Sequence, residues 1–171
     1  QTYEFTFIVS GIDPHSADLE EIFFEAGCDD ATLAWMKGVL AVSFDREEES
    51  FAQAVASAFR DLQKTGAIIE RFEPDFLVSA ADIAERSELT RAAVSNYVRG
   101  LRGEGFPAPV ARILSESPLW DWVDVANWLY RKGQVHEQVV LAADVARSVN
   151  RFVQNKRQAS DAEDEISRLL V

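Results

Sequence analysis

The segment SAADIAERSELTRAAVSNYVRG, from Ser79 to Gly100, contains the strongest structural signals of the chain. Ser79 and Thr90 have side chains that can accept a hydrogen bond from a backbone amide at the start of a helix. They predict one short helix over 80–86 and a second over 91–99. The tight turn SEL separates the two, and two short helices joined in this way form a helix-turn-helix.

The apolar residues of this segment are spaced so that the two helices can pack on each other. The small side chain of Ala84 allows the second helix to cross the first closely. The residues expected to meet between the helices are Ile83, Ala84, Leu89, Val94 and Tyr97.

The residues that follow predict a wing and a third helix. The fragments PVARI and PLWDW have the composition of two short strands, and the loop LSESP between them would form the wing. The third helix is expected in WVDVANWLYRKG, capped by Asp121 or Asp124. It would bury Val125, Trp128 and Leu129.

In combination these features resemble the winged helix-turn-helix of the MerR/excisionase superfamily, and most closely the AlpA-like phage and actinobacterial regulators. The resemblance covers about residues 77–132. Two positions depart from the family pattern, because Glu88 stands where the turn usually has glycine, and Glu116 lies in a wing that is usually basic or glycine-rich. The residues that carry the resemblance beyond the two helices are Phe106, Pro107, Pro109, Val110, Trp120, Asp124, Val125, Trp128 and Leu129.

The resemblance implies a recognition helix, Arg91–Arg99, that lies in the major groove of double-stranded DNA. Such a helix needs short polar side chains in its N-terminal half to reach the base edges. Asn96 can bind adenine through two hydrogen bonds or simply be an exposed helix residue, and Arg91 can read guanine or hold a phosphate. Arg99 and Arg102 can hold phosphates or form a solvated surface. The predicted DNA-binding residues are Thr90, Arg91, Ser95, Asn96, Arg99, Arg102 and Arg112.

The N-terminal part of the chain predicts a separate α+β domain. The segment YEFTFIVSG alternates apolar and polar side chains, which is typical of a strand. The next segment predicts a helix capped by Asp13 or Ser16. ATLAWMKGVLAVSFD predicts two strands joined at Lys37-Gly38, SFAQAVASAFRDLQKTG a second helix and AIIERFEP a last strand. The order strand-helix-strand-strand-helix-strand is that of the ferredoxin-like fold.

The net charge of −12 is distributed unevenly along the chain. Residues 1–75 hold five basic and sixteen acidic side chains, whereas residues 76–132 hold seven of each. A neutral domain with a local excess of arginine is compatible with nucleic acid, whereas an acidic domain must point away from phosphate. We therefore expect an acidic ferredoxin-like domain at 1–75 that binds a protein partner or a ligand, a winged helix-turn-helix at 76–132, and C-terminal helices at 133–171.

The C-terminal region predicts a long helix in QVHEQVVLAADVARSVNRFVQNKR and a short one in SDAEDEISRLLV. Leu141, Val145 and Phe152 widen the apolar stripe of the long helix. A stripe of this width predicts that another element packs against it. The helix can pair with its copy in a homodimer or pack on its own chain. We favour the homodimer, because two half-sites strengthen DNA binding. Ser160 and Glu163 have the spacing of a capping box at the start of the short helix.

Composition and motifs exclude several classes of protein. The chain has 171 residues, 47% hydrophobic and 27% charged, which is typical of a globular protein. It has no run of about 20 apolar residues that could span a membrane. No phosphate-binding loop, HExxH or GxSxG motif is present, so we predict no enzyme activity, no catalytic residue and no cofactor. His15, His136 and Cys28 are too scattered for a metal site, and a single cysteine fits a reducing cytoplasm.

Three functions follow from these features. The first is a sequence-specific DNA-binding transcriptional regulator that acts as a homodimer. The second is an antitoxin-type autoregulator whose acidic N-terminal domain neutralises a partner protein. The third is an excisionase-like architectural DNA-binding protein. We favour the first, because the sequence features of the helix-turn-helix are the most specific in the chain.

Overall fold

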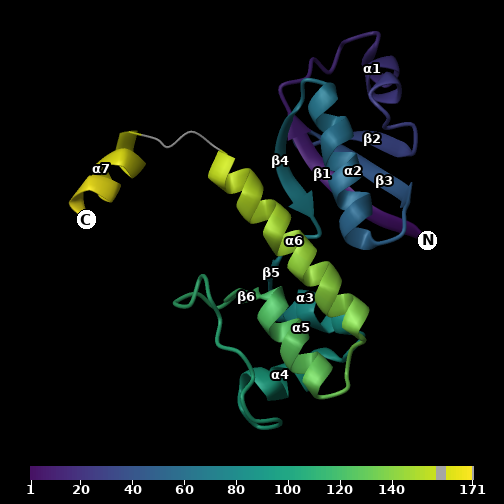
Figure 1. The fold of residues 1–171 in the computed structure, drawn as a ribbon. Coiled ribbons are helices and arrows are strands. Elements are labelled where there is room, and N and C mark those ends of the chain that lie inside the picture. Colours follow the sequence, from purple (N-terminus) through teal and green to yellow (C-terminus); the bar gives the residue numbers. More distant parts are fainter. Residues whose placement is uncertain (157–160, 171) are drawn as a thin grey trace.

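A computed structural model describes residues 1–156 and 161–170 (Figure 1). The fold is mixed α+β, and the described chain forms a four-stranded antiparallel sheet, a sheet of two short strands and seven helices. Figure 1 shows two bodies, one built on the four-stranded sheet and the other on short helices. One long helix runs beside both of them.

The first body is built on the four-stranded sheet. Its strands are β1 (Thr2–Ser10), β2 (Ala31–Met36), β3 (Val39–Glu47) and β4 (Ile68–Glu73), in the order β2-β3-β1-β4 with antiparallel neighbours. The turn predicted at Lys37-Gly38 joins β2 to β3, and its two residues have φ angles of 52° and 82°. Two positive φ angles give a hairpin turn whose twist matches that of the strands.

Two helices, α1 (Leu19–Glu25) and α2 (Phe51–Lys64), pack on the same core. Helix α1 begins later than predicted. The residue before it is Asp18, whose side chain makes no capping hydrogen bond. The prediction of Asp13 or Ser16 as the cap is therefore wrong. Asp13 accepts a backbone hydrogen bond within the preceding loop instead, and such local bonds compete with helix formation.

Aromatic side chains dominate the core of the first body. Phe7 of β1 and Phe72 of β4 have ring centres 5.2 Å apart, and Phe59 of α2 lies 5.9 Å from Phe7. These tilted and edge-on pairs stabilise the core beyond the area that they bury. The largest fully buried side chains here are Phe7, Phe23, Phe44, Phe72, Leu40, Leu62, Val9, Val42 and Val55.

One arginine, Arg46 of β3, lies inside the first body with only 7% of its surface exposed. Its guanidinium donates two hydrogen bonds of 2.8 Å to the carboxylate of Asp30 and one of 2.7 Å to Asp61. It also donates to the carbonyl of Gly27 at 2.7 Å. The hydrogen bonds to Asp30 raise the pKa of Arg46 although burial opposes this, so the side chain is charged inside the protein.

The second body contains β5 (Leu77–Val78), α3 (Ala80–Ser87), α4 (Arg91–Val98), β6 (Trp120–Asp121) and α5 (Trp122–Arg131). The first two predicted helices are present as α3 and α4, and each ends within one residue of its predicted end. The buried core of this body is Val78, Ile83, Ala84, Val94, Tyr97, Trp120, Trp122, Val123, Val125, Ala126, Trp128 and Leu129.

The predicted wing differs from the structure. PVARI does not form a strand. Its Ala111 pairs with Leu119, but only in an isolated bridge. Pro109 has no amide N–H for a strand partner, and Arg112 has a φ of 51°, which ends the pairing. PLWDW supplies β6, but β6 pairs with β5 instead of with PVARI. The segment is a loop of residues 106–119 closed by one bridge.

Helix α5 begins at one of its two predicted caps. Asp121 accepts a hydrogen bond from the amide of Val123 at 2.9 Å. Its second carboxylate oxygen accepts from Arg147 at 3.2 Å, which ties the start of α5 to the long helix. The three residues expected to be buried by α5 are buried in the core: Val125, Trp128 and Leu129.

The long helix α6 (Glu137–Lys156) packs on its own chain and joins the two cores. Ala143 belongs to the core of the second body and Ala146 to that of the first. Asn150 is 2% exposed, and its side chain accepts from the amide of Phe72 at 2.8 Å and donates to its carbonyl at 3.0 Å. This side chain therefore extends the hydrogen bonding of β4 at the edge of the sheet. One side of the wide apolar stripe is thus satisfied within the chain.

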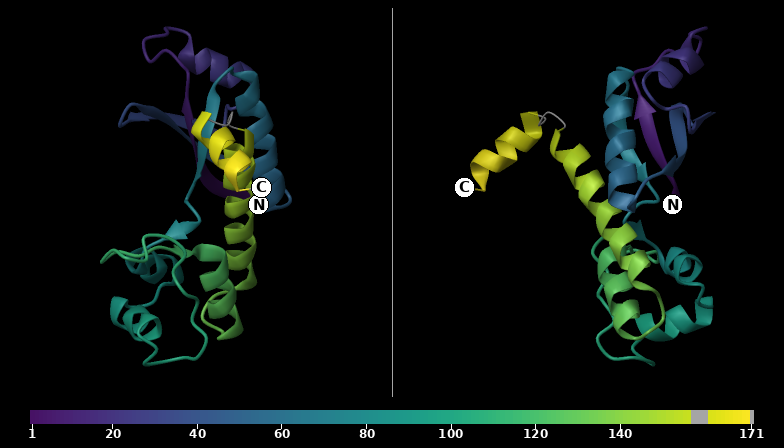
Figure 2. Two further views of the ribbon diagram at one scale, coloured as in Figure 1. Left: turned by 90° about the vertical axis from the view of Figure 1, so that its left-hand side faces the viewer. Right: turned by 45° about the vertical axis from the view of Figure 1, so that its right-hand side comes forward.

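The last helix, α7 (Asp161–Leu169), lies apart from the other elements (Figures 1 and 2). Its apolar residues are exposed to solvent. The capping box predicted for this helix includes Ser160, which lies outside the described residues.

Candidate nucleic-acid interface

Helices α3 and α4 are held by the caps that the sequence predicts. The hydroxyl of Ser79 accepts from the amide of Asp82 at 3.2 Å, and the carboxylate of Asp82 accepts from the amide of Ser79 at 2.7 Å. The hydrogen bonds that the Ser79 hydroxyl and amide donate keep the pKa of Asp82 below its ordinary value. Thr90 accepts from the amide of Ala93 at 3.1 Å at the start of α4. Both helix starts are therefore fixed by local bonds.

The turn between the helices uses a left-handed residue. Glu88 has φ 56° and ψ 22°, a left-handed conformation that glycine adopts more readily than other residues. The amide of Leu89 then donates to the carbonyl of Ala84 at 3.0 Å, which closes the turn. The chain therefore makes the turn at a cost in backbone strain that glycine would avoid.

One side of α4 faces the core and the other faces solvent. Val94 is fully buried and Tyr97 is 7% exposed, as expected from their spacing. Arg91, Ser95 and Arg99 are exposed on the outer side. Figure 2 shows α4 and the loop of residues 106–119 on the side of the second body that is opposite α6.

The structure exposes six of the seven predicted DNA-binding side chains. Asn96 is the exception, since it is half-buried; its backbone carbonyl accepts hydrogen bonds from the amides of Leu101 and Arg102 at 2.9 and 3.3 Å. Four of the exposed side chains are arginines, namely Arg91, Arg99, Arg102 and Arg112. Among the described residues, none of these four forms an ion pair with an acidic side chain.

The loop after α4 is pinned against α5. Trp128 donates its indole N–H to the carbonyl of Glu104 at 3.0 Å. Gly103 has a φ of 73°, and a Cβ at this position would lie 2.9 Å from the ring of Trp128. Tyr97 and Phe106 meet the same indole edge to face, with ring centres 5.0 and 5.2 Å from it. Residues 100–106 are therefore held in one conformation beside the exposed arginines, and these aromatic rings belong to the core.

The tip of the 106–119 loop is apolar, which the sequence reasoning missed. Arg112 accepts hydrogen bonds at its carbonyl from the amide and the hydroxyl of Ser115, at 3.0 and 2.8 Å. This turn exposes 62% of Ile113 and all of Leu114. The sequence predicts Ile113 in a strand and does not indicate this exposure. Glu116 is exposed at the same tip.

The described residues contain no group of three or more histidine, cysteine, aspartate or glutamate side chains that could hold a metal ion. Burial raises the pKa of the Cys28 thiol to about 11, so it is protonated near neutral pH. Within the described chain, no helix combines the length and the apolar character that crossing a membrane requires.

Comparison with known proteins finds no relative from which a function could be assigned. No family model matches the sequence, and neither a curated protein nor a solved structure matches it.

Proposed function

We propose that this chain is a sequence-specific DNA-binding transcriptional regulator, with a helix-turn-helix in which α4 is the recognition helix and the 106–119 loop stands in the place of a wing. One observation carries the proposal: exposed arginines that have no acidic partner among the described residues line α4 and the loop that follows it. The capped α3–turn–α4 unit supports it, as does α5 packed behind it. The strand order β2-β3-β1-β4 supports a ferredoxin-like N-terminal domain.

The outer side of α4 suits the major groove. Arg91 and Ser95 stand on its exposed side, and an arginine there can make two hydrogen bonds to guanine. Asn96 is half-buried, so its amide reaches a base only from the rim of the contact. Arg99 and Arg102 stand beyond the end of α4, where they meet the backbone phosphates. In a reducing cytoplasm the protein would bind its operator as a homodimer.

Selection from a random pool of duplex DNA by the purified chain tests this function. We expect a defined sequence to be enriched, and Arg91→Ala to weaken its binding by about 1–3 kcal/mol and to relax the preference at one base pair. Asn96→Ala should have the smaller effect, because its side chain is half-buried. Arg151→Ala, an exposed arginine on α6, is the matched control and should leave binding unchanged. Selection without enrichment would rule out sequence-specific binding.

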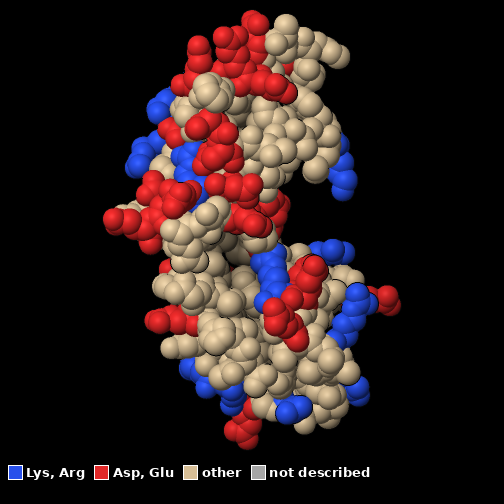
Figure 3. Space-filling model, turned by 90° about the vertical axis from the view of Figure 1, so that its right-hand side faces the viewer, with Lys and Arg blue, Asp and Glu red and all other residues tan. Residues whose placement is uncertain are grey.

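A second function, neutralisation of a basic protein partner by the N-terminal domain, is favoured by the surface charge. Figure 3 shows acidic side chains gathered over the first body, whereas basic and acidic side chains are mixed over the second. A shallow concavity of about 510 Å³ on the first body includes Asp29, Asp45, Glu47 and Glu48 in its lining. Purification from the native source at low salt should then yield a stoichiometric basic partner. That partner should be lost when Asp45, Glu47 and Glu48 are replaced by their amides; a partner that stays bound would contradict this function.

A further inference from the structure

Helix α6 has a second apolar stripe that the described part of its own chain covers only in part, because Val145 and Val149 pack against the core of the first body. Leu141 and Phe152 are 54% and 49% exposed, and Val145 and Val149 between them are half-buried. These residues recur every three or four positions, so they lie along one side of the helix. The stripe differs from the one that carries Ala143, Ala146 and Asn150, which is buried between α6 and the two bodies.

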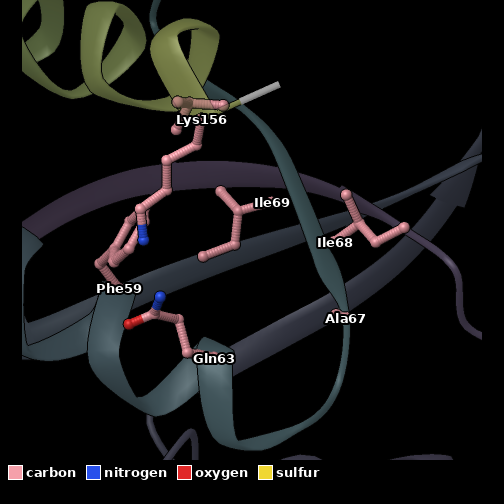
Figure 4. A pocket seen from close by; sticks show the side chains of 7 residues that line it. Phe59, Gln63, Ala67, Ile68, Ile69 and Lys156 are labelled. Carbon is pink, nitrogen blue, oxygen red and sulfur yellow. The ribbon is translucent and has the colours of Figure 1, made fainter. Parts of the chain in front are cut away.

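This second stripe forms one wall of a groove between α2 and α6. The groove has a volume of about 520 Å³, and Val55 and Phe59 of α2 form its other wall. Phe59 and Phe152 meet edge to face across it, with ring centres 5.7 Å apart. A smaller hollow of about 240 Å³ continues it around the end of α6. Figure 4 shows Lys156 reaching from α6 toward Phe59 at this end.

Helix α7 presents an apolar stripe of matching character. Ala162, Ile166, Leu169 and Leu170 have the spacing i, i+4, i+7 and i+8, so they share one side of a helix. Ile166, Leu169 and Leu170 are 54%, 72% and 81% exposed. Figure 1 and the right-hand view of Figure 2 show α7 apart from α2.

Size and charge fit α7 to the groove. The nine residues of α7 span about 14 Å, and α6 from Asp144 to Lys156 spans about 20 Å at 1.5 Å per residue. Arg60 and Lys156 line the groove at the C-terminal ends of α2 and α6, and Asp144 lines its other end. The first half of α7 is acidic and its last residues are apolar. The acidic half therefore fits beside Arg60 and Lys156, which orients α7 antiparallel to α6.

We propose that two copies of this chain form a symmetric dimer by exchanging α7, each copy placing its α7 in the α2–α6 groove of the other. A twofold exchange buries both apolar stripes of each chain and leaves neither unpartnered. The second copy is the occupant because α7 stands off its own body while the groove remains open. The exchange does not depend on DNA binding, although it would bring two α4 helices into one particle.

Light scattering coupled to size-exclusion chromatography tests the exchange with two variants. Leu169→Asp changes α7, and Phe152→Asp changes the groove. Each should weaken the dimer by about tenfold or more, because it places a charge in an apolar contact. Arg60→Glu is a second groove variant that leaves Phe152 and its packing intact, and it should weaken the dimer too. Leu114→Ser removes a fully exposed leucine outside the interface, and this control should remain a dimer.

Mixing the variants separates exchange from other arrangements. Leu169→Asp protein has an intact groove, and Phe152→Asp protein has an intact α7. An exchanged dimer therefore retains one intact contact in the mixture, and we expect heterodimers at concentrations where each variant alone is monomeric. A monomeric wild-type protein would overturn the proposal, as would dimers that survive both substitutions. A mixture without heterodimers would also overturn it, and would indicate that α7 folds onto its own chain or that the α6 helices pair directly.

Discussion

The two bodies of this protein use arginine in opposite ways. In the first body, Arg46 is buried and donates hydrogen bonds to two carboxylates and a carbonyl. In the second, Arg91, Arg99 and Arg102 are exposed and have no acidic partner among the described residues. A guanidinium whose donors are all used within the chain stabilises the fold, whereas one that faces water is available to an external anion. The comparison indicates a structural role for Arg46 and supports the DNA contact that we propose for the other three.

The largest expected effect is the loss of Arg46. Arg46→Ala removes the partner of the Asp30 carboxylate and leaves Asp61 with Lys64 alone, and should lower the free energy of unfolding by about 3 kcal/mol. Arg91→Ala is the same change in the other body and should alter it by less than about 0.5 kcal/mol. Urea unfolding of both variants measures the difference. Equal free energies of unfolding for the two variants would contradict the different roles of arginine in the two bodies.

The loop after α4 should be the next most sensitive. Gly103→Ala introduces a Cβ 2.9 Å from Trp128 at a φ of 73°, and should cost about 2 kcal/mol of stability. Gly100 has a similar φ of 68°, but no described residue other than its chain neighbours lies within 4 Å of a Cβ there, so Gly100→Ala should cost only about 1 kcal/mol. Thermal unfolding compares the two. An equal cost would show that Trp128 does not hold the loop.

The cap of α3 should contribute about 1 kcal/mol, and this contribution should depend on pH. Ser79→Ala removes the cap, whereas Ser95→Ala removes an exposed hydroxyl from α4 and should not change stability. The pKa of Asp82 is lowered in the folded state, so its contribution is present above the unfolded value of about 3.9 and is lost as the pH falls. The stability difference between wild type and Ser79→Ala should therefore shrink below about pH 4. A constant difference would show that Asp82 is not coupled to the cap.

The smallest effect on stability belongs to the apolar tip of the 106–119 loop. Leu114 is fully exposed, so Leu114→Ser should leave unfolding unchanged within about 0.5 kcal/mol. Apolar side chains at such a tip can insert between base pairs in the minor groove and bend DNA. If the protein has the excisionase-like architectural role, this variant should reduce bending in a circular-permutation assay while Arg91→Ala reduces affinity. Bending that is unchanged in Leu114→Ser would argue for a simple regulator.

Local signals made the second body largely predictable. The caps at Ser79 and Thr90, the inward spacing of Val94 and Tyr97, and the cap at Asp121 each depend on residues within a few positions. The four strands of the first body and the turn at Lys37-Gly38 were also correct as individual elements.

Long-range contacts made the rest unpredictable. Asn150 pairs with Phe72, 78 residues away, so no local pattern indicates that α6 would join both cores. Arg46 looks like one charge in an acidic run until the fold brings Asp30 and Asp61 beside it. The prediction of the wing was wrong for the same reason. Strand β6 pairs with β5, which lies more than forty residues earlier in the chain.

The salt dependence of binding to a random DNA duplex tests the division between the two bodies most directly, since it needs no operator. The logarithm of the binding constant of the wild-type protein should fall linearly with the logarithm of salt concentration. Arg99→Ala and Arg102→Ala should each reduce the slope by about 0.9, the contribution of one phosphate contact, while the control Arg151→Ala should leave it unchanged. Slopes that are the same in all four proteins, or binding that does not depend on salt, would contradict the assignment of these arginines to DNA.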